Sequence, residues 1–140
     1  MTMRPLALIL LAALPALAAP VPKEVQKQTD AERFVGTWET VTSESGGNPY
    51  SKARWTFAVD LKMTSNPLPG EVGGTSEWVI KIDPKAMPKT IDIGSYPGVY
   101  EFDGPDIKVA YTVGGARPTE AKSSGGVYYS VLRRVPEKKK

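Results

Sequence analysis

Acidic side chains are the groups in this chain whose types and spacing could do chemistry. The candidates are Asp83, Asp92, Glu101, Asp103, Asp106 and Glu120. A pair of carboxyl groups could act as general acid and base, or bind a hard cation through oxygen. However, Asp83 and Asp92 alternate with isoleucines and so face outward if the isoleucines form the core, and Asp103 and Asp106 flank a predicted tight turn. We therefore expect no catalytic pair, and no metal site, because residues 103–106 lack the full ligand series of a calcium loop.

The chain contains no histidine and no cysteine. The usual general base near neutral pH, the thiolate nucleophile, the thiolate zinc site and the disulfide are therefore all excluded. Several serines fall in turn-like stretches without a GxSxG motif: Ser43, Ser45, Ser123 and Ser124. The paired glycines form neither GxGxxG nor a phosphate-binding loop. We expect a protein that is not an enzyme and that needs no cofactor.

Alternation of apolar and polar residues is the dominant pattern after Phe34. In residues 54–63 the apolar face reads Trp55, Phe57, Val59, Leu61 and Met63, which predicts one half-buried strand. The same alternation recurs in residues 78–82, 91–93, 100–102 and 107–113. Upstream, one face of a predicted strand carries Phe34, Gly36, Trp38 and Thr40.

Turn signals separate these runs at residues 46–49, 66–70, 95–98 and 103–105. A last strand is predicted near residues 127–135, but both of its faces are mixed, so its register stays open. About eight strands with almost no helix indicate an all-β antiparallel meander. The periodicity allows either a barrel or a sandwich, and a barrel has the advantage of removing exposed strand edges.

The N-terminus has the features of a secretory signal peptide. Arg4 precedes an apolar run over residues 6–14, and Ala16-Leu17-Ala18 fits a small-x-small cleavage site, so residues 1–18 are the predicted leader. An uncleaved membrane anchor is the alternative, although the apolar run is short for a bilayer. Residues 19–32 read as a linker with a short helical turn capped by Thr29 or Asp30. Residues 33–135 form one domain and residues 136–140 a basic tail.

The leader predicts a protein that is secreted, periplasmic or bound to the cell envelope, without a stable membrane span. The chain has 18 basic and 15 acidic residues, and the basic surplus gathers at the C-terminus. Nucleic-acid binding is not expected, because such proteins spread lysine and arginine along one surface and interleave aromatics. We expect a monomer.

Four motifs occur in a fixed order: Gly36-Thr37-Trp38, IDPKAMPKTIDI at 82–93, GVYEFDG at 98–104 and RPTE at 117–120. The series resembles the small lipocalin-like domains of unknown function that are common in planctomycetes. The resemblance implies a lipocalin-like β-barrel of about eight strands. It also implies that Trp38 packs at the closed end against Arg133 or Arg134, through a cation–π contact. Ala121 and Lys122 depart from the family pattern, which commonly has phenylalanine after RPTE.

Two functions from different classes remain open. The first is binding of a small apolar or amphiphilic molecule in the barrel, which inward aromatic residues would line: Trp38, Trp55, Phe57, Trp78, Tyr100 and Tyr111. Alternatively, these residues fill the barrel, and the domain recognises an envelope protein through its loops. An internal cavity favours the first reading, and an exposed apolar patch at Leu68 or Tyr96 favours the second.

Arg117 is a further candidate on a loop. Because it precedes Pro118, its backbone is extended and its side chain has a defined direction. It could bind an acidic ligand, or form an ion pair with Asp92 or Glu120 that locks the loop over the barrel.

Overall fold

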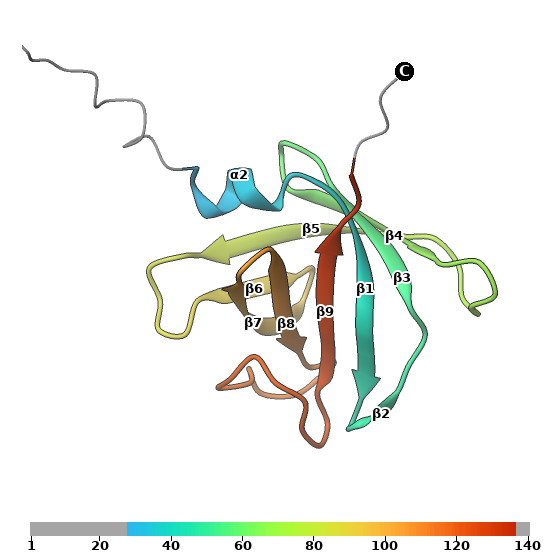
Figure 1. Ribbon diagram of the computed structural model, residues 1–140. Coiled ribbons are helices and arrows are strands. Elements are labelled where there is room, and N and C mark those ends of the chain that lie inside the picture. The colour runs from blue at the N-terminus through green and yellow to red at the C-terminus, as the bar shows by residue number, and fades with distance from the viewer. Residues whose placement is uncertain (1–27, 137–140) are drawn as a thin grey trace, which may run out of the picture.

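The computed structural model describes residues 28–136. The predicted leader, residues 19–27 of the linker and residues 137–140 of the basic tail lie outside the described residues. The described chain contains one short helix and nine strands (Figure 1). The helix is α2 (Asp30–Phe34), and the strands are β1 (Gly36–Ser45), β2 (Asn48–Pro49), β3 (Ala53–Phe57), β4 (Lys62–Pro67), β5 (Ser76–Asp83), β6 (Thr90–Ile93), β7 (Tyr96–Asp103), β8 (Asp106–Tyr111) and β9 (Tyr128–Arg134).

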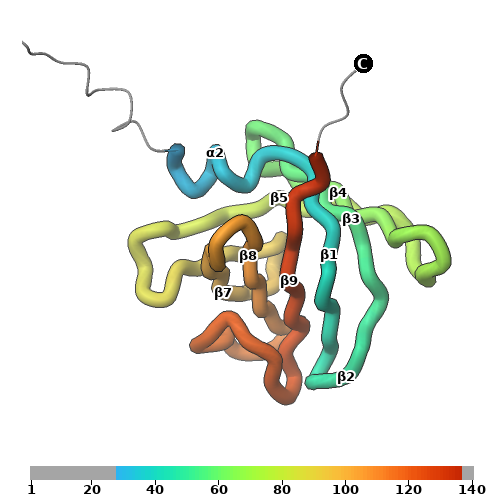
Figure 2. The backbone as a smooth tube through the Cα atoms, in the orientation of Figure 1, coloured from blue at the N-terminus to red at the C-terminus, as the bar shows by residue number. Residues whose placement is uncertain are grey.

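The sheet is a closed antiparallel meander. Successive strands pair in chain order from β1 to β9, and β2 forms a short hairpin at the end of β1. The pairing of β1 with β9 closes a barrel of eight strands, so the predicted all-β fold is confirmed and the sandwich is excluded (Figures 1 and 2). This architecture is compatible with a lipocalin-like fold. Closure leaves the main strands without the unpaired edges that promote association.

The predicted inward faces of several strands form the core. Ile80 on β5, Ile91 and Ile93 on β6, and Ile107 and Val109 on β8 are buried. Their polar neighbours on the same strands point to the outer surface, as a period of two requires. The register of the last strand, which the sequence left open, places Ser130 and Leu132 of β9 inside.

Residues 54–63 do not form the single strand that the sequence predicts. A tight turn at residues 58–61 divides them into β3 and β4, with Ala58 N–H donating to Lys62 O and Leu61 at φ 63°. Val59 is 85% exposed, so it is not part of the inward face. The register pairs Phe57 with Met63, six positions further on, so both face inward and the alternation continues across the turn, which periodicity therefore does not reveal.

Phe34 belongs to α2 and not to the first strand, which corrects the strand face predicted upstream of Trp38. Thr29 is the N-cap, and it exchanges hydrogen bonds with Glu32 in a capping box. The helix lies across one end of the barrel (Figure 1). There the fully buried Phe34 ring packs against Phe57 and Tyr100, each at a centroid distance of 5.1 Å.

Trp38 and Arg134 complete this closed end. The Arg134 guanidinium lies over the Trp38 ring at 4.3 Å and donates to the carbonyl oxygens of Arg33 and Val35. The Trp38 indole donates to Phe34 O at 2.8 Å. Of the two arginines that the resemblance offered, Arg134 is therefore the partner of Trp38, while Arg133 pairs with Asp106 on the outer face.

In residues 28–136 no helix is long and apolar enough to cross a membrane.

We expect Trp38→Ala to lower the free energy of unfolding by about 3–5 kcal/mol, because it removes a buried aromatic ring and leaves a cavity. Urea unfolding at equilibrium measures this loss. Val59→Ala is the control, because Val59 is exposed in a turn and its loss should cost less than about 0.5 kcal/mol. A loss below about 1 kcal/mol for Trp38→Ala would contradict a structural role for the closed end.

Candidate functional site

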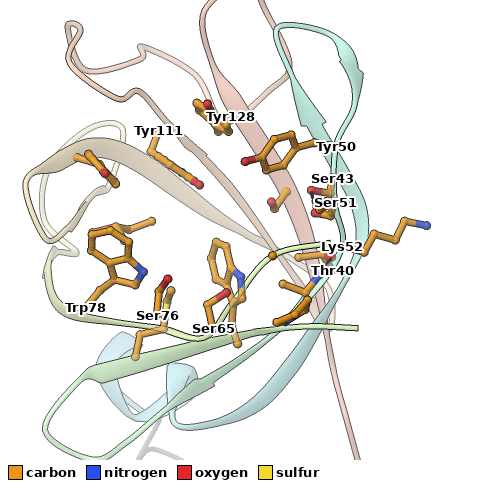
Figure 3. A pocket seen from close by; sticks show the side chains of 18 of the residues that line it. Thr40, Ser43, Tyr50, Ser51, Lys52, Ser65, Ser76, Trp78, Tyr111 and Tyr128 are labelled. Carbon is orange, nitrogen blue, oxygen red and sulfur yellow. Dashed lines mark hydrogen bonds between the residues drawn. The ribbon is translucent and has the colours of Figure 1, made fainter. Parts of the chain in front are cut away.

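The barrel contains a cavity of about 290 Å³ at the end opposite α2 (Figure 3). Its floor consists of Trp55, Met63 and Ile93, three buried side chains from β3, β4 and β6. The β1–β2 hairpin and the loop that joins β4 to β5 border its mouth. The cavity is therefore the open counterpart of the end that α2 closes.

Aromatic rings form an arc along one side of the cavity. In order around the wall, the arc consists of Trp78, Tyr96, Tyr111, Tyr128 and Tyr50. Neighbouring centroids lie 5.1, 6.0, 5.3 and 5.2 Å apart. The three central tyrosines are stacked, with interplanar angles of 13° and 12° between neighbours.

Small hydroxyl side chains line the rest of the wall: Thr40, Ser43, Ser51, Ser65, Ser76 and Ser130. Ser43 donates to Ser51 O and Thr40 accepts from Ala53 N–H, so these two hydroxyls hold the neighbouring backbone. Ser65 and Ser76 are cross-strand partners on β4 and β5. The sequence prediction that Ser43 and Ser45 lie in a turn is wrong, because both belong to β1.

The six aromatic residues predicted as lining separate into two groups. Trp55, Trp78 and Tyr111 line the cavity. Trp38, Phe57 and Tyr100 are buried at the closed end, packed together with Phe34. The barrel is thus filled in one half and hollow in the other. Ligand contact by any of these residues stays a prediction.

The two groups also differ in how their polar tips are paired. At the closed end, Trp38 donates to Phe34 O and the Tyr100 hydroxyl donates to Asp30 at 2.7 Å. Around the cavity, the structure of residues 28–136 gives no protein hydrogen bond to the indole nitrogens of Trp55 and Trp78 or to the hydroxyls of the arc tyrosines. Buried indole and phenol groups usually have a hydrogen-bond partner. The open half therefore presents donors that the fold itself does not use.

Sequence reasoning missed Tyr50, Tyr96 and Tyr128. The sequence predicts a turn at residues 95–98, but the turn lies at Gly94-Ser95 and β7 begins at Tyr96. Tyr96 then shares the inward face with Tyr100, two steps of alternation further on. Tyr128 is not predicted to face inward because the sequence leaves the register of the last strand open. Tyr50 lies in the segment after β2, outside any strand.

Arg117 forms the ion pair that the sequence allowed with Asp92, with Nη1 at 2.8 Å from Oδ1. The same nitrogen donates to Gly98 O at 2.9 Å and Ile91 O at 3.4 Å, so its approach to Asp92 is ionic and not a hydrogen bond. These contacts fasten the long β8–β9 connection to β6 and β7. Arg117 does not line the cavity.

The other candidate carboxylates lie on the outer surface in ion pairs or turns. Asp106 pairs with Arg133 at 3.0 Å, Asp103 with Lys108 at 3.5 Å, and Glu120 with Lys122 at 3.4 Å. The side-chain hydrogen bond from Arg133 holds the pKa of Asp106 below its usual value. Within the described residues, no three acidic side chains gather into a cluster that could hold a metal ion.

A larger hollow of about 630 Å³ lies beside α2, between residues 87–89 and residues 119–122. Its cationic side chains already have partners. Lys89 pairs with Asp30 at 2.9 Å, Lys108 and Lys122 pair with acidic neighbours, and Arg33 stacks on Phe102 at 3.7 Å. We therefore regard the cavity inside the barrel as the candidate site.

Comparison with protein-family models, curated proteins and solved structures finds no match to the chain.

Tyr100, Asp30 and Lys89 form a polar group that fixes α2 to β7. Burial raises the pKa of Tyr100, and its hydrogen bond to Asp30 raises it further. Burial also tends to raise the pKa of Asp30, but hydrogen bonds from Tyr100 and Lys89 outweigh it, and the net shift is downward. A carboxylate whose pKa is lowered by folding stabilises the folded state above its unfolded pKa and loses that contribution as the pH falls.

We therefore expect Asp30→Asn to lower the free energy of unfolding at pH 7 by about 1–3 kcal/mol. The difference from the unsubstituted protein should shrink as the pH falls below about 4, where the carboxyl group of Asp30 takes up a proton. Urea unfolding between pH 3 and pH 7 measures this. Glu77→Gln, at an exposed site, is the control. A pH-independent difference would contradict the ionic role of Asp30.

Proposed function

We propose that the chain binds a small amphiphilic molecule in the open half of its barrel. One observation carries this proposal: an aromatic arc faces a wall of hydroxyl groups across a cavity of about 290 Å³ with an apolar floor. Ligand pockets typically combine apolar walls with a few polar groups that fix orientation, and this volume lies near the lower end of their range. The ligand is therefore small.

The environment of the cavity supports binding and not catalysis. Two residues that are ordinarily ionised border the cavity, Glu44 and Lys52. Lys52 points away from the cavity in Figure 3, and Glu44 follows the inward Ser43 on β1, so alternation turns it outward. A general acid or base needs an ionisable group within reach of the reacting atoms. Hydroxyl and indole groups without an ionisable side chain beside them are better suited to binding a ligand than to transferring a proton.

The alternative, an envelope-protein interaction module with a filled barrel, has less support. An interaction module of this kind predicts an exposed apolar patch at Leu68 or Tyr96, and both residues are half-buried. Tyr96 stacks within the arc that lines the cavity. The strongly exposed apolar residues that do occur, such as Val59 and Met87, lie on separate loops.

We further propose that the protein belongs to the planctomycete-type lipocalin-like domains of unknown function and acts outside the cytoplasm. The ordered motifs from Gly36 to Glu120 support membership, and so does the contact of Trp38 with Arg134. The apolar run and the Ala16-Leu17-Ala18 site support export.

Export predicts that the natural protein begins at Ala19. Intact-mass measurement on protein purified from its own cells should give the mass of residues 19–140, because the signal peptidase removes the leader. The chain produced without an export pathway, in a cell-free system, is the control and should keep its leader. A natural protein that retains residues 1–18 would contradict cleavage.

Filling the cavity should abolish binding without unfolding the barrel. Ser130 is 5% exposed and lines the cavity from β9, so Ser130→Leu places three more carbon atoms there. We expect 2-naphthol, a small amphiphilic probe, to cause saturable amide shifts in nuclear magnetic resonance spectra at cavity strands, and Ser130→Leu to weaken binding at least about tenfold. Val131→Leu is the matched control, since the adjacent side chain faces outward. Equal binding by both variants would contradict this location of the site.

A further inference from the structure

We infer that the ligand of this cavity is a neutral ring compound of about ten to fifteen non-hydrogen atoms that carries at least one hydrogen-bond acceptor oxygen. The inference rests on the proposed function and specifies its ligand class. Three features of the cavity carry it: the two indole donors, the stacking of the tyrosines, and the absence of an inward charge among the described lining residues.

The indole groups are donors only, so they require acceptors. Trp55 is 6% exposed, and its nitrogen has no hydrogen-bond partner in residues 28–136. It is not one of the fully enclosed side-chain atoms that lack a hydrogen bond there, which are Asp92 Oδ1 and Ser123 Oγ. The Trp55 N–H is therefore not sealed inside the protein, and Trp55 is one of the residues that line the cavity.

Trp78 directs its donor to the same space. A Cβ atom built on Gly94 would lie 2.9 Å from Cε3 of Trp78, so the benzene edge of this indole faces the β6–β7 turn. The opposite edge carries the nitrogen, which points toward the middle of the cavity in Figure 3. Two indole groups from β3 and β5, both donors only, thus line one volume, where a ligand oxygen can accept a hydrogen bond.

The tyrosine arc disfavours a cationic ligand. A cation is attracted to the face of an aromatic ring. Tyr111 stacks between Tyr96, at a centroid distance of 6.0 Å, and Tyr128, at 5.3 Å, so its faces are turned toward these two rings. The edges and hydroxyls remain for the ligand, and ring edges carry partial positive charge, which attracts electron-rich oxygen atoms.

No lining side chain of the described residues supplies an inward charge to balance that of a ligand. Lys52 and Glu44 turn away from the cavity, and burial raises the pKa of Tyr111, so its phenol stays neutral. A charged group enters such a site at a large desolvation cost unless a counter-charge meets it. A volume of about 290 Å³ equals the liquid volume of about ten water molecules, which suits a bicyclic ring.

Three bicyclic probes of similar shape test the inference on the full chain: coumarin, naphthalene and N-methylquinolinium. Coumarin is neutral and has acceptor oxygens, naphthalene is neutral without them, and N-methylquinolinium is a cation. Dissociation constants are measured by amide shifts for the unsubstituted protein, Trp78→Phe and Trp55→Phe, after urea unfolding has shown each variant to be folded. Naphthalene serves as the internal control for lost apolar contact, because phenylalanine is smaller than tryptophan.

We expect Trp78→Phe to weaken coumarin binding about three- to tenfold more than naphthalene binding, the effect of one lost hydrogen bond. N-methylquinolinium should bind at least about tenfold more weakly than coumarin. If both indole variants weaken coumarin and naphthalene equally, the acceptor requirement is wrong, although binding in the cavity stands. Cation binding as tight as that of coumarin would overturn neutrality. If no bicyclic probe binds, and 2-naphthol does not bind either, the proposed function fails as well.

Discussion

Arg134 joins the parts of the chain on which the closed barrel depends. Its guanidinium donates to Arg33 O and Val35 O and lies over Trp38, so it connects the last strand, the end of α2 and the first strand. Gly36 allows this approach, because a Cβ there would overlap with Nη1 of Arg134, and because its φ of 127° disfavours other residues. Arg134 therefore explains two positions of the Gly36-Thr37-Trp38 motif: the glycine leaves room for its guanidinium, and the tryptophan supplies the ring over which the guanidinium lies.

This arrangement makes the two ends of the barrel unequal. Phe34 fills the end that α2 covers, and the polar atoms of Trp38 and Tyr100 are paired there with Phe34 O and Asp30. No corresponding helix among the described residues covers the other end, which the β1–β2 hairpin borders. Since the inward residues there include small serines in place of phenylalanines, the same strand spacing leaves a cavity. The position of the cavity thus follows from residue size along the barrel axis.

The sequence predicted which face of most strands points inward, because alternation depends only on the parity of residue positions. It could not predict how far along the barrel each residue lies. Trp38 and Trp55 are register partners on β1 and β3, yet Trp38 contacts α2 and Trp55 forms the cavity floor. Strand tilt and pairing register decide this height, and both depend on partners distant in the chain. Alternation also does not reveal the turn at residues 58–61, because the paired residues Phe57 and Met63 are an even number of positions apart.

The motifs that suggested the lipocalin-like family contribute almost nothing to the cavity. Residues 36–38, 98–104 and 117–120 are absent from its lining, and from residues 82–93 only Ile93 takes part. They act elsewhere: Lys89 and Tyr100 bind Asp30, and Arg117 ties the β8–β9 connection to Gly98 O. Gly98 also allows the close approach of the β8 backbone, because an added Cβ would lie 2.6 Å from Ala110 O and 3.2 Å from Tyr111 Cα. The resemblance therefore concerns residues that build the scaffold, whereas the residues that line the cavity lie, apart from Ile93, outside those motifs, and two proteins could share all four motifs and differ in their cavities.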